Sequence, residues 1–421
     1  MLKKTAVWVA RLLLGVTFML SGMAKMIDLH GSINKFNDYF AAWGITDLFP
    51  EGLVLMAATG LAMAEFLTGF TLATGSMRRT SAVCATAIMV FMLPLSAYIW
   101  AANPVEDCGC FGDWLIISNA ATFWKNVVLT ALALFLLRYN NQAPTLFAPW
   151  IQWVQIAVAA TYCGFIGVIG YNEQPLIDFR PYPVGTSIVP ADDEDLSQTY
   201  VYRSTADGSI AEYDIYNLPD ETEHPELEFI EIRDASPSDS RRTNTFAILD
   251  PETGQDITDS VIADTSGPLL LMLIPDLHAA GVSMSYNANE LASHTPLIAL
   301  TDATAAEIDR WRDLAMADYP VYRADARTLA TIARGKVALV MTRDGIISWK
   351  RTLSSVDTDA DLARYDADNG SHRFLLLTTL FLALQGSIFL LGSIPGVFRP
   401  TKTKNPAKTC TNKKNSLNLR H

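Results

Sequence analysis

The chain has 421 residues, a hydrophobic fraction of 50% and a formal net charge of -12. This acidic balance argues against nucleic-acid binding, because phosphate contacts require clustered Lys and Arg. These whole-chain averages combine two kinds of segment that differ in composition. Residues 1–170 and 373–398 are apolar and nearly free of charge, whereas residues 171–372 are acidic and polar. The sequence therefore predicts a membrane domain, a soluble domain and one further apolar segment.

Six apolar runs are long enough to cross a bilayer core, which takes about 20 helical residues. Each must be helical, because lipid offers the backbone no hydrogen-bond partner. Arg11 interrupts the first run and five more spans follow it, so we expect a membrane helix there and not a cleaved signal peptide. The predicted spans are 6–27, 52–74, 80–102, 118–138, 150–170 and 373–395.

Basic residues mark one side of this predicted membrane domain. If the spans alternate, all of the following fall on that side: Lys3, Lys4, Arg78, Arg79, Arg138 and the basic tail 396–421. The positive-inside rule then places both termini in the cytoplasm, with the 103–117 loop and residues 171–372 outside the inner (cytoplasmic) membrane. The spans show no evident inverted repeat, which argues against a transporter.

Two of the five cysteines, Cys108 and Cys110, form a pair on the predicted extracytoplasmic side, where disulfides can form. A Cys-Gly-Cys bridge closes a small strained ring that should be readily reduced, and Gly109 supplies the backbone freedom it requires. The other three lie within spans or in the tail: Cys84, Cys163 and Cys410. The pair is therefore placed for thiol–disulfide chemistry, and we favour Cys110 as the attacking thiolate.

Three carboxylates surround this pair and argue against a reactive thiolate: Glu106, Asp107 and Asp113. They raise a thiol pKa unless a cation such as Lys125 reaches the loop. A static bridge in an exposed turn is the alternative interpretation. No metal is expected, because the outer loops hold no second Cys or His pair for zinc.

Ionisable residues inside the spans form a second group of candidates. Arg11, Glu65 and Lys125 lie within predicted spans, where charged groups face the bundle interior and pair. We expect Glu65 to pair with Arg11 or Lys125. Such a pair either fixes helix register or serves as a proton relay or quinone-facing polar group. The sequence shows no evident cofactor site. A quinone is the one cofactor that these intramembrane polar residues could still contact.

The first 140 residues resemble a known family. "RLLLGVTFMLSGMAKMID" (11–28) and "AEFLTGFTLATGSMRR" (64–79) resemble the first two helices of the DoxX superfamily. "DCGCFGD" followed by "WKNVVL" resembles the third loop and fourth helix of its methylamine-utilisation MauE branch. The resemblance implies a four-helix membrane bundle of the type associated with extracytoplasmic redox maturation. It also implies site roles for Cys108 and Cys110, and bundle polar roles for Arg11, Lys25 and Glu65.

Short elements are predicted beyond the bundle. "TYVYRS" and "IAEYDIYNL" predict a hairpin, and acidic, Pro-containing stretches predict loops over 219–228 and 234–239. "PLLLMLI" (268–274) predicts a buried strand, and "KVALVMTRDGIISWKR" an antiparallel pair turning at Asp344-Gly345. "ATAAEIDRWRDLAMA" predicts a helix with Ile308, Trp311 and Leu314 on one face.

The order of elements over 244–355 is similar to a thioredoxin-like domain. The Cys-x-x-Cys of that fold would follow the first core strand, but this chain has "IPDLHAAG" there, with Asp276 and His278. Gly335 stands where a cis-proline is expected. The domain is therefore predicted to dock a partner. We expect His278 to be a surface residue, with a ligand or acid–base role as the alternative. The sequence thus divides into the four-helix membrane domain (1–140), a fifth membrane helix (141–171), a β-rich segment (172–243), the thioredoxin-like domain (244–355), a sixth membrane helix (373–395) and a basic cytoplasmic tail (396–421).

Two functions remain open from the sequence. In the first, Cys108 and Cys110 exchange with an extracytoplasmic client or thiol–disulfide partner that the outer domain docks, in contact with membrane lipid. In the second, the chain is a non-catalytic scaffold or assembly factor, its Cys pair is static and its outer domain binds a protein. Whether the chain is an enzyme depends on which applies.

Overall fold

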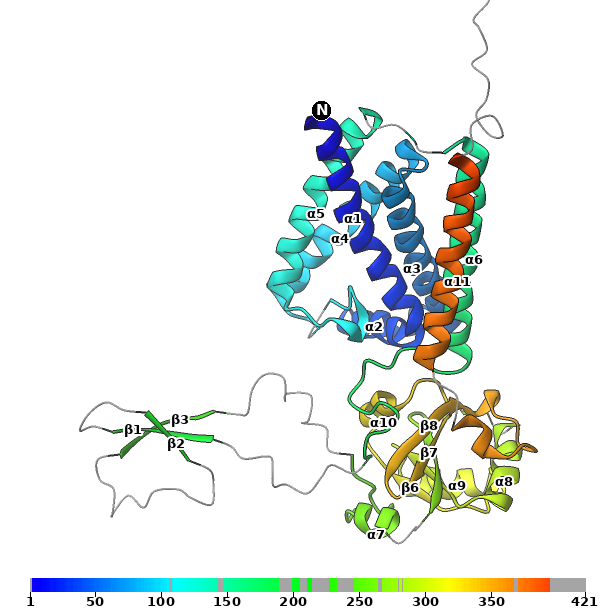
Figure 1. Cartoon of the computed structure of the whole chain (residues 1–421). Coiled ribbons are helices and arrows are strands. Elements are labelled where there is room, and N and C mark those ends of the chain that lie inside the picture. The colour runs from blue at the N-terminus through cyan, green and yellow to red at the C-terminus, as the bar shows by residue number, and fades with distance from the viewer. Residues whose placement is uncertain are drawn as a thin grey trace, which may run out of the picture.

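The computed structural model describes residues 2–105, 108–142, 145, 147–188, 199–204, 210–213, 227–233, 246–263, 267–278, 280–281, 283–366 and 370–393. Six described helices are long and apolar enough to cross a membrane, which confirms the predicted spans. A mixed five-stranded α/β domain lies at one end of the helical bundle (Figure 1). The protein is thus a multi-pass helical membrane protein with one α/β domain beside the membrane.

The membrane part is built on close contact between its first and third helices. A Cβ atom at Gly22 would lie 2.5 Å from the carbonyl oxygen of Ala62, and one at Gly69 would lie 2.5 Å from the Gly15 carbonyl oxygen. Small residues at these positions let the two backbones approach each other. The long helices are α1 (Leu2–Ile27), α3 (Glu51–Thr74), α4 (Arg78–Ala102), α5 (Asn119–Tyr139), α6 (Pro149–Asn172) and α11 (Gly370–Ser393).

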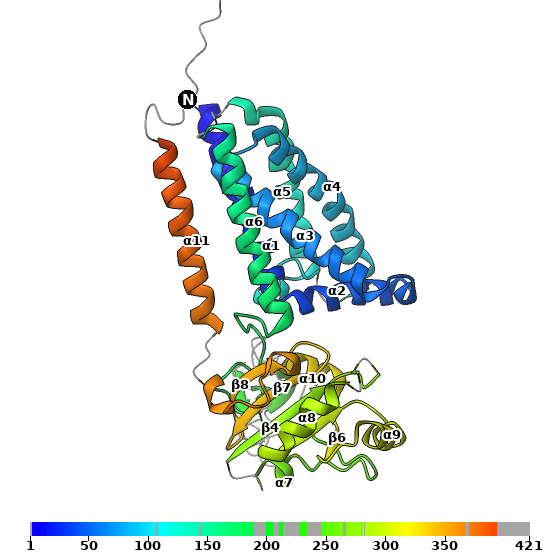
Figure 2. The same cartoon turned by 90° about the vertical axis from the view of Figure 1, so that its right-hand side faces the viewer.

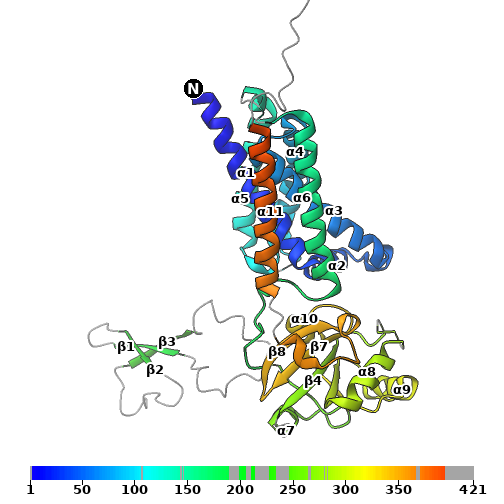
Figure 3. The same ribbon diagram turned by 45° about the vertical axis from the view of Figure 1, so that its right-hand side comes forward.

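Helix α11 packs against α6 at the edge of the bundle (Figures 2 and 3). The Tyr162 and Phe381 rings stack with centroids 4.4 Å apart, and the Tyr162 hydroxyl lies 2.7 Å from that of Thr378. The two helices that enter and leave the α/β domain are therefore joined side by side.

A short helix, α2 (Leu29–Ala42), was not predicted from the sequence. It lies across the foot of the bundle, between the long helices and the α/β domain (Figures 1 and 2). The Asp28 carboxylate caps it by accepting a hydrogen bond from the Gly31 backbone N–H (2.8 Å). Leu29, Ile33 and Tyr39 are buried. Its amphipathic spacing was the available signal.

The α/β domain is a single mixed sheet covered on both faces. Its strand order is β6-β5-β4-β7-β8, with β4 parallel to β5 and antiparallel to β7. Alternate residues of β4 enter two separate cores, Leu270 and Met272 on one face and Leu269 and Leu271 on the other. The strands are β4 (Pro268–Ile274), β5 (Leu297–Thr301), β6 (Val321–Arg323), β7 (Ala338–Arg343) and β8 (Ile346–Thr352). The predicted buried strand and hairpin are both confirmed.

The helices of this domain cover the sheet and contribute side chains to both cores. They are α7 (Thr258–Ala263), α8 (Ser283–His294), α9 (Ala305–Ala315) and α10 (Ala326–Ile332). The prediction for the face of α9 was wrong in one residue. Ile308 and Trp311 are buried, but Leu314 is 59% exposed and Ala315 takes its place. A step of four residues from Trp311 returns closer to the buried face than a step of three.

A separate three-stranded antiparallel sheet has the order β2-β1-β3. The strands β1 (Thr199–Ser204) and β2 (Ile210–Tyr213) confirm the predicted hairpin, whose turn (205–209) lies outside the described residues. Strand β3 (Leu227–Arg233) begins inside a stretch predicted as a loop, so that prediction was wrong at its end. The Leu-x-Phe-Ile pattern there is typical of a strand, but the neighbouring acidic residues led to the loop prediction.

Candidate functional site

Cys108 and Cys110 lie together in the loop between α4 and α5, at the end of the bundle that faces the α/β domain. Residues 108–114 are called the Cys loop below, and it includes the short helix η2 (Gly112–Trp114). Both cysteines are half-buried thiols with their Sγ atoms 3.1 Å apart. Gly109 between them has a φ of 65°, the left-handed conformation that glycine adopts most easily. The local fold thus brings the pair within reach of bond formation.

A buried ion pair supports the loop from below. The Lys25 ammonium lies 2.6 Å from the Glu65 carboxylate and donates a hydrogen bond to the Cys110 carbonyl (2.9 Å). The Ser21 hydroxyl lies within hydrogen-bond distance of the same carboxylate (2.8 Å) and carbonyl (2.6 Å). Two polar residues of α1 therefore hold the backbone of the Cys loop directly, and Glu65 of α3 holds those two residues in place.

The expected partner of Glu65 was wrong. Neither Arg11 nor Lys125 pairs with it; Lys25 does. Lys25 lies 14 residues beyond Arg11 along α1, a rise of about 21 Å. Arg11 instead donates to the Asn140 side chain (2.6 Å) and backbone carbonyl (2.9 Å) at the opposite end of the bundle. Its role is to join α1 to the turn after α5, away from the cysteines.

Cations reach the loop, which answers the objection raised by its carboxylates. Lys125 on α5 places its ammonium 4.5 Å from the centre of the Phe111 ring. The hydrogen bond from Cys108, aided by the charges of Lys125 and Lys25, lowers the pKa of the Cys110 thiol to about 6 despite burial. The same hydrogen bond and burial raise the pKa of Cys108. Cys110 is thus the more acidic thiol of the pair.

The loop is also tied to the α/β domain, through residues that sequence analysis missed. Arg334, just after α10, donates to the Asp28 carboxylate (2.8 Å) and to that of Asp113 in the Cys loop (2.6 Å). The Asp113 carboxylate therefore pairs with the Arg334 guanidinium of the α/β domain. The Tyr39 hydroxyl on α2 donates to the Cys108 carbonyl (2.9 Å). Contacts between residues 221 positions or more apart leave no signal in a single sequence.

The comparison with known families agrees with this arrangement of helices and loop. Residues 3–139 match the family model described as methylamine utilisation protein MauE. These residues are a MauE-family membrane domain. No curated protein and no solved structure matches the chain. The MauE domain contains α1 to α5 and the whole Cys loop, whereas the α/β domain has no family assignment and its thioredoxin-like character stays a prediction.

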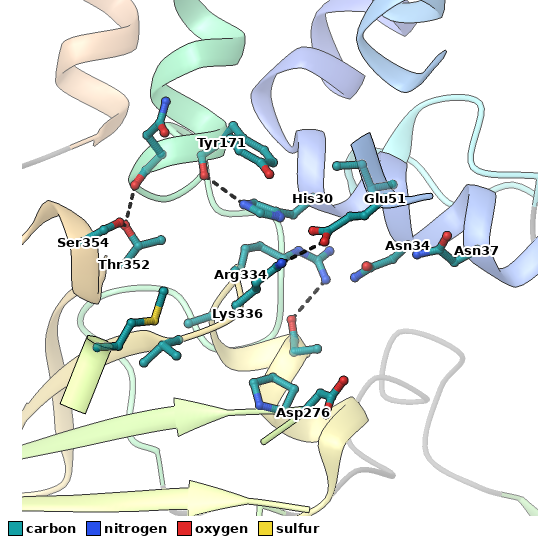
Figure 4. A pocket seen from close by; sticks show the side chains of 18 residues that line it. His30, Asn34, Asn37, Glu51, Tyr171, Asp276, Arg334, Lys336, Thr352 and Ser354 are labelled. Atoms are coloured by element: carbon teal, nitrogen blue, oxygen red, sulfur yellow. Dashed lines mark hydrogen bonds and ion pairs between the residues drawn. The ribbon is translucent and has the colours of Figure 1, made fainter. Parts of the chain in front are cut away.

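A cavity of about 480 Å³ lies between the MauE domain and the α/β domain (Figure 4). Its walls include the loops that follow β4 and precede β7, at Asp276 and Gly335, so these loops face the membrane domain. Lys336 pairs with Glu51 across it (2.8 Å). The loops at Asp276 and Gly335 are therefore at the contact with the MauE domain.

A second cavity, of about 280 Å³, adjoins the Cys loop. Its lining includes Asn34 and Arg334, which also line the first cavity, together with Asp113 and Lys35. The Lys35 side chain covers Gly109, since a Cβ there would lie 2.7 Å from the Lys35 Cγ. The second cavity thus lies beside the first and is bordered by Asp113 of the Cys loop.

His278 lies on the surface as predicted, with its ring 3.2 Å from the Glu307 carboxylate. Within the described part of the chain, no group of three or more His, Cys, Asp or Glu is arranged to hold a metal ion.

Proposed function

We propose that this MauE-family integral membrane protein takes part in extracytoplasmic thiol–disulfide maturation, with Cys108 and Cys110 exchanging with client proteins. The observation that carries the proposal is the pairing of a cation-supported Cys110 thiolate with a Cys108 thiol 3.1 Å away. A purely structural turn needs neither the cations nor the unequal pKa values. Thiolates are the nucleophiles of disulfide exchange.

The exchange has two steps. The Cys110 thiolate attacks one sulfur of a client disulfide, and the other client sulfur leaves as a thiolate while a mixed disulfide forms. Cys108 then loses its proton and attacks Cys110, which releases the client dithiol and leaves a Cys108–Cys110 disulfide. The reverse sequence oxidises a client dithiol. The short distance between the two sulfurs favours the second step, because the reacting atoms are already in contact.

The α/β domain has two roles in this proposal. Through Arg334 it holds the Cys loop, and through the polar cavities beside Asn34 and Arg334 it offers a client a binding surface next to the thiols. Tethering such a surface to the membrane raises the effective concentration of the client at the pair. The basic flanks of the spans support an extracytoplasmic position for the whole site.

The experiment is a redox titration in membranes, on a background in which the other three cysteines, Cys84, Cys163 and Cys410, are replaced. The membranes are equilibrated in glutathione buffers of stepped potential, and a mass-tag maleimide then counts free thiols. We expect the pair to change from two free thiols to none at one midpoint. Cys108→Ser should form a mixed disulfide with glutathione more readily than Cys110→Ser, because it keeps the thiolate.

A pair that stays fully oxidised or fully reduced at every potential would favour the scaffold hypothesis. The side of the membrane is tested in the same background. A membrane-impermeant maleimide added to sealed cells should label the reduced pair, and labelling only after lysis would place the loop in the cytoplasm.

A further inference from the structure

A third cavity adjoins the cysteine pair within the MauE domain. It measures about 170 Å³, and its wall includes Cys108, Gly109 and Cys110. Most of the remaining wall is apolar, from α2, α3 and α4, with Leu61, Met92 and Leu95 among them. Aromatic rings dominate the α2 side: Phe36, Tyr39, Phe40 and Trp43. The cysteine pair therefore borders a largely apolar cavity.

The part of this cavity that α3 and α4 line reaches the depth of the hydrocarbon. Phe91 in its wall is 13 residues into the 25-residue helix α4, and Leu61 is 10 residues into the 24-residue helix α3. Phe91 is 63% exposed, although it is large and apolar. Exposed apolar side chains in the middle of a span face lipid. A ligand of this cavity would thus arrive from the bilayer and not from water.

The size and charge of the cavity limit what fits. A cavity of about 150 Å³ holds one benzene ring, so about 170 Å³ holds one substituted six-membered ring. The Lys25 ammonium, also in the wall, provides positive charge beside the thiols. That charge stabilises a ring oxygen that becomes negative as electrons reach it. These features together describe a planar electron acceptor with an apolar tail that remains in lipid.

We propose that this cavity binds the ring of a lipid-soluble quinone, which reoxidises the Cys108–Cys110 dithiol. The two thiols lose two protons and two electrons and form one S–S bond, and the quinone takes up both electrons and two protons to become a quinol. The resulting disulfide then oxidises a client dithiol. This inference rests on the proposed function and assigns its direction, from client to quinone.

The experiment uses the full chain in detergent, reduced and freed of reductant, with a short-chain benzoquinone as the probe. Quinol formation is followed by ultraviolet absorbance and disulfide formation by thiol counting. We expect one quinol for each disulfide. Leu95→Trp, which fills the cavity, should slow the reaction about tenfold or more by excluding the ring. Val90→Trp is the matched control, because Val90 is 63% exposed on the same helix and outside the cavity.

Oxidation by glutathione disulfide is measured on the same samples. Loss of quinone reduction in Leu95→Trp with normal oxidation by glutathione disulfide supports the inference, and Leu61→Phe serves if Leu95→Trp does not fold. Oxidation by glutathione disulfide without any reaction with the quinone, or equal rates in Leu95→Trp and Val90→Trp, overturns the quinone site but leaves the proposed function intact. Failure of both oxidants overturns the proposed function itself.

Discussion

Replacing Arg334 should loosen the contact between the α/β domain and the Cys loop. Its guanidinium, with a side chain only 10% exposed, is held between the 10% exposed Asp28 and the 43% exposed Asp113. Burial disfavours the Asp28 carboxylate, yet the charges of Arg334 and Arg180 reverse this and lower the pKa of Asp28. Arg334→Gln leaves that carboxylate buried without its main partner.

Removing one partner of a buried ion pair costs about 3–5 kcal/mol. The exposure of Asp113 limits its share, so we expect about 3 kcal/mol for Arg334→Gln. Each 1.4 kcal/mol is about a factor of ten, so the ratio of docked to undocked domain should fall by about 100-fold. The backbone pairing of Arg334 with the Gln174 side chain (2.7 and 2.9 Å) is retained, which keeps the change local.

Hydrogen–deuterium exchange is the assay that locates this loss. Amides of α2, the Cys loop and the turn before β7 should exchange faster in Arg334→Gln, whereas the centre of β4 should not change. Lys336→Gln is the matched control, because its ion pair with Glu51 crosses the same boundary but is 45% and 58% exposed. Such exposed pairs contribute about 0–1 kcal/mol. Equal exchange in the two variants would refute the assignment of the contact to Arg334.

Acid provides an independent check of the same contact. The pKa of Asp28 is lower in the folded protein than its ordinary 3.8, so its contribution to stability is present above pH 3.8. That contribution is lost as the pH falls through the lower folded value. Wild-type docking should therefore weaken below about pH 4, and Arg334→Gln should lose this part of the acid dependence.

Three further predictions concern the bundle and the thiols. Gly22→Ala should lower the free energy of unfolding by about 1–3 kcal/mol, because the added Cβ meets the α3 backbone. Gly60→Ala, where the added Cβ enters open space, should raise this free energy by up to about 1 kcal/mol. Both changes are measured by thermal denaturation in detergent. Glu65→Gln should lower the free energy of unfolding by about 3–5 kcal/mol, because it leaves the buried Lys25 ammonium without its carboxylate partner. Lys25→Met combined with Glu65→Leu should recover most of that loss. A double variant no more stable than Glu65→Gln would contradict an ion pair as the cause. The iodoacetamide rate of Cys110 should rise with pH through about 6 and then level off. A midpoint near the ordinary 9.0 would show that no stabilised thiolate exists.

Local pattern was sufficient for much of the fold. Lipid requires helices at least about 20 residues long, so the six spans follow from apolar length alone. The run "PLLLMLI" had no polar face, so it was predicted as a strand covered on both sides, and β4 is such a strand. Local pattern predicted less at Leu314 on α9, where steps of three and of four residues both fit one helix face. It also missed the short amphipathic helix α2.

The cysteine pair could be proposed from the sequence because it depends on neighbours in the chain. Cys108, Gly109 and Cys110 are adjacent, and a backbone with a positive φ at the glycine brings the two sulfurs together. The partner of Glu65 could not be found in this way. Three cations were available in the bundle, and helix packing decides which of them lies at the same depth and on the facing side.

By itself the sequence determined which segments cross the membrane, where two thiols stand next to each other, and that an α/β domain follows. Only the tertiary structure decided that Lys25 and Glu65 hold the Cys loop, that Arg334 joins it to the α/β domain, and that an apolar cavity opens beside it. The physical reason is range. Hydrophobic length and adjacency act within one segment, whereas ion pairs and cavities depend on how separate segments pack, which no single segment encodes.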